Sequence, residues 1–117
     1  MKMNEFNFTD RKCSTCNPDT PPIEGEKLHR YFNELSDGWT LVDDHQLEKS
    51  WRFKNFRQAL DFTVKIGEMS EVEGHHPEIL LTWGKVKVIV FTHAIDALSE
   101  NDFIWAAKVD KLLEESR

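Results

Sequence analysis

The sequence predicts a single α+β domain, in which a largely antiparallel sheet carries helices on one face. Three observations lead to this fold class. The hydrophobic pattern changes along the chain in the order helix, strand, strand, helix, strand, strand, helix. Each pair of strands is separated by a turn too short to hold a helix, as in a hairpin. The length of 117 residues suits one compact domain and leaves little room for a second.

The first 22 residues are expected to form an irregular N-terminal arm, followed by one domain over residues 23–117. The arm is rich in prolines and shows no periodicity. Its two cysteines, Cys13 and Cys16, have the spacing of half a zinc site or of a redox pair. Because no second pair of this kind follows, the spacing favours two ordinary thiols, with a metal or redox role as an open alternative.

The first helix is predicted over residues 23–35, because four large apolar side chains share one face at helical spacing. These are Leu28, Tyr31, Phe32 and Leu35. Two strands follow over residues 39–42 and 47–53, on either side of an Asp-Asp turn. Alternation places one set of residues on the same side of the second strand. This set comprises Leu47, Lys49, Trp51 and Phe53.

The second helix is expected over residues 55–73. Asn55 is placed to cap it, with Gln58 in the capping-box position, and Gly74 and Pro77 end it. Its apolar stripe is predicted from helical spacing. The stripe consists of Phe56, Ala59, Leu60, Thr63, Val64, Ile66, Met69 and Val72.

The last two strands are predicted over residues 79–83 and 85–92, with a hairpin turn at Gly84. Val86, Val88 and Val90 share one face of the second strand. The opposite face changes from charged to apolar and ends at His93, as expected of a surface that enters a pocket or an interface. The third helix is predicted from residue 99 to about residue 115.

Composition and charge restrict the class of function. The net charge of −6 argues against nucleic acid as a partner, since phosphate binding needs a basic surface. No apolar run approaches the roughly 20 residues of a membrane span. The first residues also lack the apolar segment of a secretion signal. A cytoplasmic protein without a membrane anchor is therefore expected.

Three of the five histidines are candidates for chemistry. His75 and His76 follow the second helix at the corner between Gly74 and Pro77, and His93 closes the last predicted strand. Two imidazoles that face one substrate can carry out a dehydration, in which one protonates a leaving hydroxyl and the other removes a proton. From these residues alone, this interpretation and a structural role for the corner are equally supported. A three-histidine metal site is a weaker alternative.

Carboxylates stand close to these histidines in the sequence. Ser99 and Asp102 have capping-box spacing, so Asp102 is expected to satisfy the helix start, and it can also orient an imidazole or a substrate amine. Glu71 and Glu73, on the last turn of the second helix, are predicted to be solvated surface residues. Glu71 is the better candidate to support an imidazole.

Several segments, in this order and spacing, resemble the pterin-4a-carbinolamine dehydratase family. The segments are Glu71-Val72-Glu73-Gly74-His75-His76-Pro77, Trp83-Gly84-Lys85-Val86, Thr92-His93 and Leu98-Ser99-x-x-Asp102. The resemblance covers about residues 39–112, and the cysteine pair followed by prolines is similar to bacterial members. It implies a four-stranded antiparallel sheet with three helices on one face (α-β-β-α-β-β-α), and a homodimer or dimer of dimers.

The resemblance also implies an activity. The reaction is dehydration of 4a-hydroxytetrahydropterin to quinonoid dihydropterin and water, without a metal or organic cofactor. This reaction recycles the pterin of aromatic amino-acid hydroxylases such as phenylalanine hydroxylase. Some relatives serve instead as transcription-factor cofactors or resemble assembly chaperones, so a non-catalytic binding role is the second hypothesis. The chaperone-like members tend to lose the histidine set, and its retention here favours the enzyme.

Position by position, the resemblance implies the residues of the site. The catalytic set is His75, His76, His93 and Asp102, with His75 and His93 as acid and base in an order left open. The pterin would be bordered by Gly74, His75, His76, Pro77, Phe91, Thr92, His93 and Ala94. Two positions depart from the family pattern. Ile79 replaces a frequent aromatic residue, and Ala97 replaces the usual glycine, so the loop after His93 is expected to differ.

Overall fold

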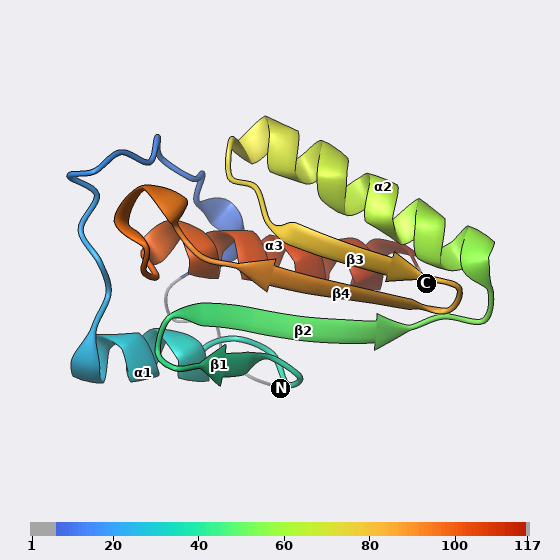
Figure 1. Cartoon of the computed structure of the whole chain (residues 1–117), viewed down its shortest axis with the longest axis horizontal. Coiled ribbons are helices and arrows are strands. Elements are labelled where there is room, and N and C mark those ends of the chain that lie inside the picture. Colours follow the sequence, from blue (N-terminus) through green and yellow to red (C-terminus); the bar gives the residue numbers. More distant parts are fainter. Residues whose placement is uncertain (1–6, 117) are drawn as a thin grey trace.

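The computed structural model describes residues 7–116 and confirms the predicted α+β fold, with three helices and a four-stranded antiparallel sheet. The elements are η1 (Phe8–Asp10), α1 (Gly25–Asn33), β1 (Thr40–Val42), β2 (Gln46–Arg52), α2 (Phe56–Glu73), β3 (Glu78–Thr82), β4 (Lys85–Val90), η2 (His93–Ile95) and α3 (Glu100–Ser116). The strand order is β1-β2-β4-β3, so two hairpins lie side by side and α2 connects them (Figure 1).

One face of the sheet is buried under the helices. Val86, Val88 and Val90 of β4 are fully buried, as the alternation predicts. Trp51 and Leu47 of β2 lie opposite Val86 and Val90 in register and are buried with them. Cross-strand neighbours share a face, so these residues form one apolar surface. α2 packs on β3, on β4 and on α3.

The buried face of α2 differs from the predicted stripe. Its buried residues are Ala59, Phe62, Ile66, Ser70 and Glu73. Phe56, Val64 and Val72, which the predicted stripe includes, are exposed. Apolar residues occur on several sides of this helix, so spacing alone did not identify the face that contacts the sheet. Among the described residues, no helix combines the length and apolar character needed to cross a bilayer.

Glu73 is buried, so its prediction as a solvated surface residue is wrong. Its carboxylate accepts a hydrogen bond from Lys108 Nζ at 2.7 Å and another from the backbone N–H of Cys13 at 2.9 Å. Burial raises the pKa of Glu73, but the Lys108 ammonium and the Cys13 N–H outweigh it, and the pKa lies below its usual value. Through these two contacts the Glu73 carboxylate joins α2 to Lys108 of α3 and to Cys13 of the N-terminal arm.

The chain after β4 also differs from the prediction. β4 ends at Val90, and His93 begins the 3-10 turn η2 instead of closing the strand. Thr92 and Ala97 form an isolated antiparallel bridge around this turn. The residue in the left-handed region is Asp96, with φ of 49°, and aspartate tolerates that conformation better than most residues. Ala97 therefore takes its place without a positive φ.

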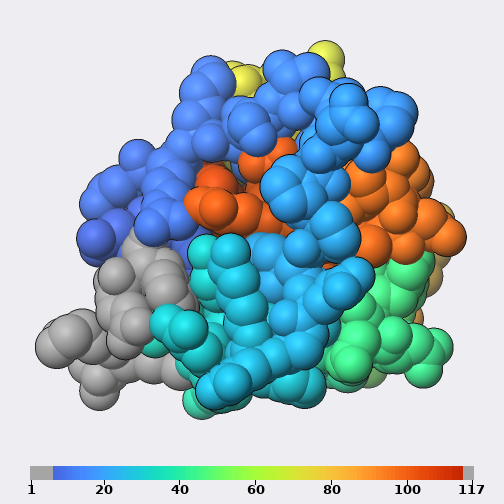
Figure 2. Space-filling model, turned by 90° about the vertical axis from the view of Figure 1, so that its left-hand side faces the viewer, coloured from blue at the N-terminus to red at the C-terminus, as the bar shows by residue number. Residues whose placement is uncertain are grey.

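The N-terminal arm packs against the domain. Phe8 is fully buried, and its ring centroid lies 5.4 Å from that of Tyr31 and 6.1 Å from that of Phe103. Cys13 is buried in the same core. Figure 2 shows the arm, in blue, lying across the first turn of α3, in orange. Apart from η1 the arm is irregular, but its anchoring side chains belong to the core.

This packing predicts that the arm contributes to stability. Phe8→Ala should lower the free energy of unfolding by about 3–5 kcal/mol, the usual cost of removing a buried phenylalanine ring. Urea denaturation followed by circular dichroism measures it. Phe56→Ala is the matched control, because this residue is 44% exposed, and it should cost about 1 kcal/mol or less. Equal effects of the two changes would contradict the packing of the arm.

Candidate active site

The histidine pair is placed by the end of α2. Gly74 caps the helix with φ of 66°, a conformation that suits glycine. Its N–H and that of His75 both bond to the carbonyl of Ser70. The next two side chains then diverge, as neighbouring side chains in an extended segment do. His75 is 5% exposed and points into the protein, whereas the His76 side chain is 58% exposed.

The buried imidazole meets the buried carboxylate of Asp102. His75 Nε2 lies 2.6 Å from Asp102 Oδ1. The other oxygen, Oδ2, accepts hydrogen bonds from the hydroxyl of Thr92 and from the backbone N–H of Ser99, both at 2.8 Å. Asp102 therefore has both of the roles that the sequence allowed, since it caps α3 and holds an imidazole.

Only half of the predicted capping box forms. The Ser99 N–H donates to Asp102, but the Ser99 hydroxyl lies 2.6 Å from the hydroxyl of Thr92. Thr92 follows the end of β4, so this pair of hydroxyls joins the strand to the helix start. The Asp102 N–H bonds to the Ser99 carbonyl at 3.1 Å.

These contacts fix the tautomer of His75. An ionised carboxylate can only accept hydrogen bonds, and Asp102 faces three donors if Nε2 of His75 carries its hydrogen. In the neutral ring the lone pair is then on Nδ1.

The exposed histidines have different partners. His76 Nε2 lies 2.5 Å from Glu71 Oε2, so Glu71 contacts an imidazole, and its supporting role stays a prediction. The exposed ring of His93 packs against Phe91, with the centroids 4.1 Å apart and the ring planes tilted by 40°. The segments 74–77 and 91–94 lie at the same end of the sheet, where α2 and β4 both end (Figure 1). All the residues expected to border a pterin lie in these two segments.

Sequence reasoning missed His45. It is the last residue of the turn between β1 and β2, and the centroid of its ring lies 4.5 Å from that of Phe91. Its Nε2 lies 2.8 Å from Asp96 Oδ1. The hydrogen bond to the Asp96 carboxylate, followed by the one to Gln46, raises the pKa of His45 above its usual value. In the sequence, only its position next to the Asp43-Asp44 turn could have indicated that His45 lies near the site.

Cys16 was also missed as a neighbour of the site. Its Sγ lies 3.6 Å from Nδ1 of His75. Cys13 and Cys16 are both free thiols. Within residues 7–116, no three His, Cys, Asp or Glu side chains are grouped as ligands for a metal ion.

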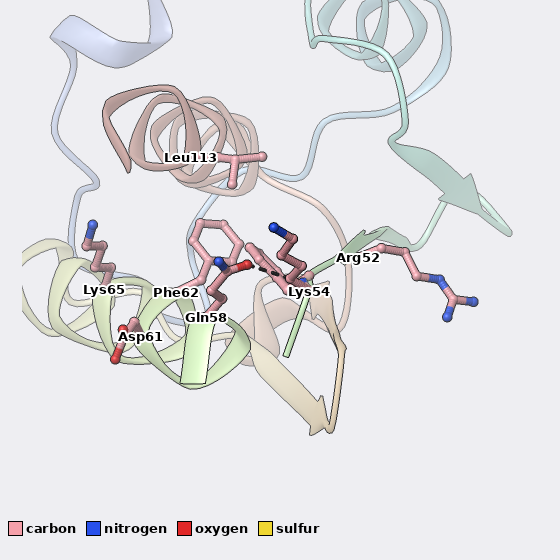
Figure 3. A pocket seen from close by; sticks show the side chains of 8 residues that line it. Arg52, Lys54, Gln58, Asp61, Phe62, Lys65 and Leu113 are labelled. Atoms are coloured by element: carbon pink, nitrogen blue, oxygen red, sulfur yellow. Dashed lines mark hydrogen bonds between the residues drawn. The ribbon is translucent and has the colours of Figure 1, made fainter. Parts of the chain in front are cut away.

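A separate hollow of about 480 Å³ lies at the opposite end of the sheet, where β2 ends and α2 begins (Figure 3). Its lining residues are Arg52, Phe53, Lys54, Gln58, Asp61, Phe62, Lys65 and Leu113. The lining residues of α2 reach as far as Lys65, whereas the histidine corner follows the last residue of the helix. At 1.5 Å per residue, the distance along the helix from Lys65 to the corner is about 14 Å.

Known proteins with similar sequences share one description. Residues 21–112 match the family described as "Pterin 4 alpha carbinolamine dehydratase". A protein of Alkaliphilus metalliredigens is 50% identical over 109 residues, covering 93% of this chain and 98% of its own length. One of Rubrobacter xylanophilus is 48% identical over 105 residues, covering 90% and 97%. Both are named, provisionally, as pterin-4-alpha-carbinolamine dehydratases.

A solved structure has the same fold. It is described as a transcriptional coactivator/pterin dehydratase from Brucella melitensis. It superposes with a TM-score of 0.73 and 27% sequence identity, covering 79% of this chain and 98% of the other.

The contact between His45 and Asp96 gives a pH-dependent prediction. Asp96→Asn should lower the pKa of His45, and Asp44→Asn, which removes an exposed charge from the neighbouring turn, should change it less. The pKa of His45 is higher in the folded state than in the unfolded chain, so the His45–Asp96 contact stabilises the fold when His45 is protonated. This stabilisation is complete at pH values below the ordinary histidine pKa. It is lost as the pH rises through the raised pKa of the folded state. NMR titration of the His45 imidazole measures its pKa in both variants. An unchanged pKa of His45 in Asp96→Asn would refute the conclusion that Asp96 raises it.

Proposed function

The chain belongs to the pterin-4a-carbinolamine dehydratase family of hydro-lyases, and from this premise we propose that its histidines catalyse the loss of water from 4a-hydroxytetrahydropterin. The product is quinonoid dihydropterin. One observation carries the proposal. A buried imidazole, His75, is held by a buried carboxylate, Asp102, at the end of the sheet where His76 and His93 are exposed.

The chemistry of a carbinolamine matches this arrangement. Its hydroxyl and its amine nitrogen are bonded to the same carbon. Water leaves when the hydroxyl gains a proton and the C–O bond breaks, while the nitrogen loses a proton and its electron pair forms a C=N bond. One group must therefore give a proton and another must take one. Imidazoles do both near neutral pH.

The histidines divide this work according to their surroundings. His75 and His93 carry the two proton transfers. The carboxylate of Asp102 keeps Nδ1 of His75 available and stabilises its protonated ring, as in other carboxylate–histidine pairs. His93 is exposed, so it exchanges its proton with water between turnovers. His76, oriented by Glu71, contacts the pterin and supports the other two.

The pterin lies between the two segments that meet at this end of the sheet. Phe91 is partly buried and offers an aromatic surface to a flat heterocycle. The backbone of both segments supplies donors and acceptors for the edge of the ring. The bordering residues are Gly74, His75, His76, Pro77, Phe91, Thr92, His93 and Ala94.

The proposal includes the cellular role that the family implies. The enzyme acts in the cytoplasm as a homodimer or dimer of dimers and recycles the pterin used by phenylalanine hydroxylase. β3 is an edge strand of the sheet, and Leu80 on it is 54% exposed. An apolar residue on an exposed sheet edge suits a contact between subunits. Size-exclusion chromatography with light scattering measures the subunit number.

The decay of synthetic 4a-hydroxytetrahydropterin tests the activity. The wild type should accelerate it over buffer, and His75→Ala and His93→Ala should each lower kcat/KM by about 100-fold, because general acid and base groups contribute that much. His29→Ala is the matched control on the exposed surface of α1 and should match the wild type. A wild type without acceleration would refute the dehydratase. An active wild type with fully active His75→Ala and His93→Ala would refute the residue assignment.

Asp102→Asn tests the role of the carboxylate charge. Asparagine keeps the size, but its single oxygen can accept from His75 or from the Ser99 N–H and not from both, and it carries no charge to balance a protonated ring. We expect kcat to fall by about 100-fold, with a smaller change in KM, because the charge matters most when the ring is protonated. Circular dichroism checks that the variant is folded. Unchanged kcat in a folded variant would count against the assigned role.

A further inference from the structure

The proton-carrying atom of His75 faces the N-terminal arm. Nε2 of the ring is taken by Asp102, so Nδ1 is the nitrogen left for proton exchange. The Sγ atom of Cys16 lies 3.6 Å from Nδ1, within reach of a hydrogen bond to sulfur. The imidazole is only 5% exposed, so the arm shields Nδ1 from most of the solvent.

The thiol of Cys16 is itself held in place. Asn101, which is buried in the first turn of α3, donates from Nδ2 to Cys16 Sγ at 3.1 Å and to the carbonyl of Ser14 at 2.8 Å. Its Oδ1 accepts from the Ser14 N–H at 3.0 Å. Asn101 thus pins residues 14–16 to the helix start. The sulfur accepts from the amide, and its S–H has two acceptors within reach, Nδ1 of His75 at 3.6 Å and the Ser14 carbonyl at 4.0 Å, of which Nδ1 is the nearer.

One turn of helix therefore controls both nitrogens of the same ring. Asp102 binds Nε2 directly, and the preceding residue, Asn101, holds the thiol that meets Nδ1. An imidazole held at both nitrogens keeps one tautomer and one orientation. A ring bound at Nε2 alone can still turn about that hydrogen bond.

We propose that Cys16 is a positioning residue for His75, so that the N-terminal arm is part of the active site. In the free enzyme the thiol donates S–H to Nδ1 of the neutral ring, and the reacting atom of the substrate takes the place of the sulfur when the proton is transferred. No redox step is involved. The catalytic meaning of this contact rests on the proposed function, whereas the contact itself does not.

The other cysteine does not share this role. Cys13 Sγ faces the carbonyl of Asn101 at 3.5 Å. Burial, and then the charge of Glu73, raise the pKa of the Cys13 thiol to about 12, so it stays protonated and structural. Glu73 and Lys108, two charged groups that act on Cys13, are paired with each other. Asp102 is the charged group with a direct contact to His75.

Three variants test the proposal. Cys16→Ala should lower kcat by about 10-fold with KM within about 2-fold of the wild type, because positioning affects the proton transfer more than substrate binding. Cys16→Ser should recover most of the loss, since a hydroxyl also donates to Nδ1. Thr15→Ala, an exposed position in the same loop, is the matched control and should behave as the wild type.

NMR of ¹⁵N-labelled histidine reports the tautomer of His75, which a change in the overall stability of the fold alone would not alter. His75 should show a single tautomer in the wild type and in Cys16→Ser, and a mixture or shifted signals in Cys16→Ala. Urea denaturation verifies that all three variants are folded. Wild-type kcat together with wild-type His75 signals in Cys16→Ala would overturn the proposal. If the wild type does not accelerate the reaction, the proposed function fails, and the NMR comparison alone then decides whether Cys16 holds the ring.

Discussion

The arrangement of the whole site depends on one buried carboxylate. Asp102 is fully buried, and burying an ionised group costs several kcal/mol unless hydrogen-bond donors replace the water around it. Its donors come from three separate places: His75 after α2, Thr92 after β4, and the backbone N–H of Ser99 before α3. The charge can be buried only when these three segments meet. The same contacts that complete the fold therefore assemble the site.

The N-terminal arm extends this arrangement by the same means. The first turn of α3 supplies Asn101 to residues 14–16, and the last turn of α2 supplies Glu73 to the backbone of Cys13. Each of these polar groups is buried, so each needs its partner in the arm to avoid an unsatisfied donor or acceptor. Phe8 adds apolar burial at the far end of the arm. The described part of the arm is thus held in place by side-chain contacts, although its only regular element is the single 3-10 turn η1.

The sequence predicted those features that depend on local spacing. Alternation located Val86, Val88 and Val90 on the buried face, and capping-box spacing placed Asp102 at a helix start. Features that depend on distant partners were missed. Glu73 was predicted to be solvated because Lys108, its partner, is 35 positions away. Cys16 lies 59 positions from His75, so no local pattern connects the two. α2 carries apolar side chains on several sides, and only the sheet decides which of them are buried.

The adjacent histidines show why the division of proton transfers follows from the fold. His75 lies in a closed set of hydrogen bonds in which Asp102 holds Nε2, and its side chain has little access to water. His76 is one residue away, but its side chain is 58% exposed and its partner is a surface carboxylate. A base must be restored after each turnover, and a shielded ring can return its proton only through a neighbour. In the proposed reaction, that neighbour is the substrate itself, whereas His93 exchanges directly with solvent.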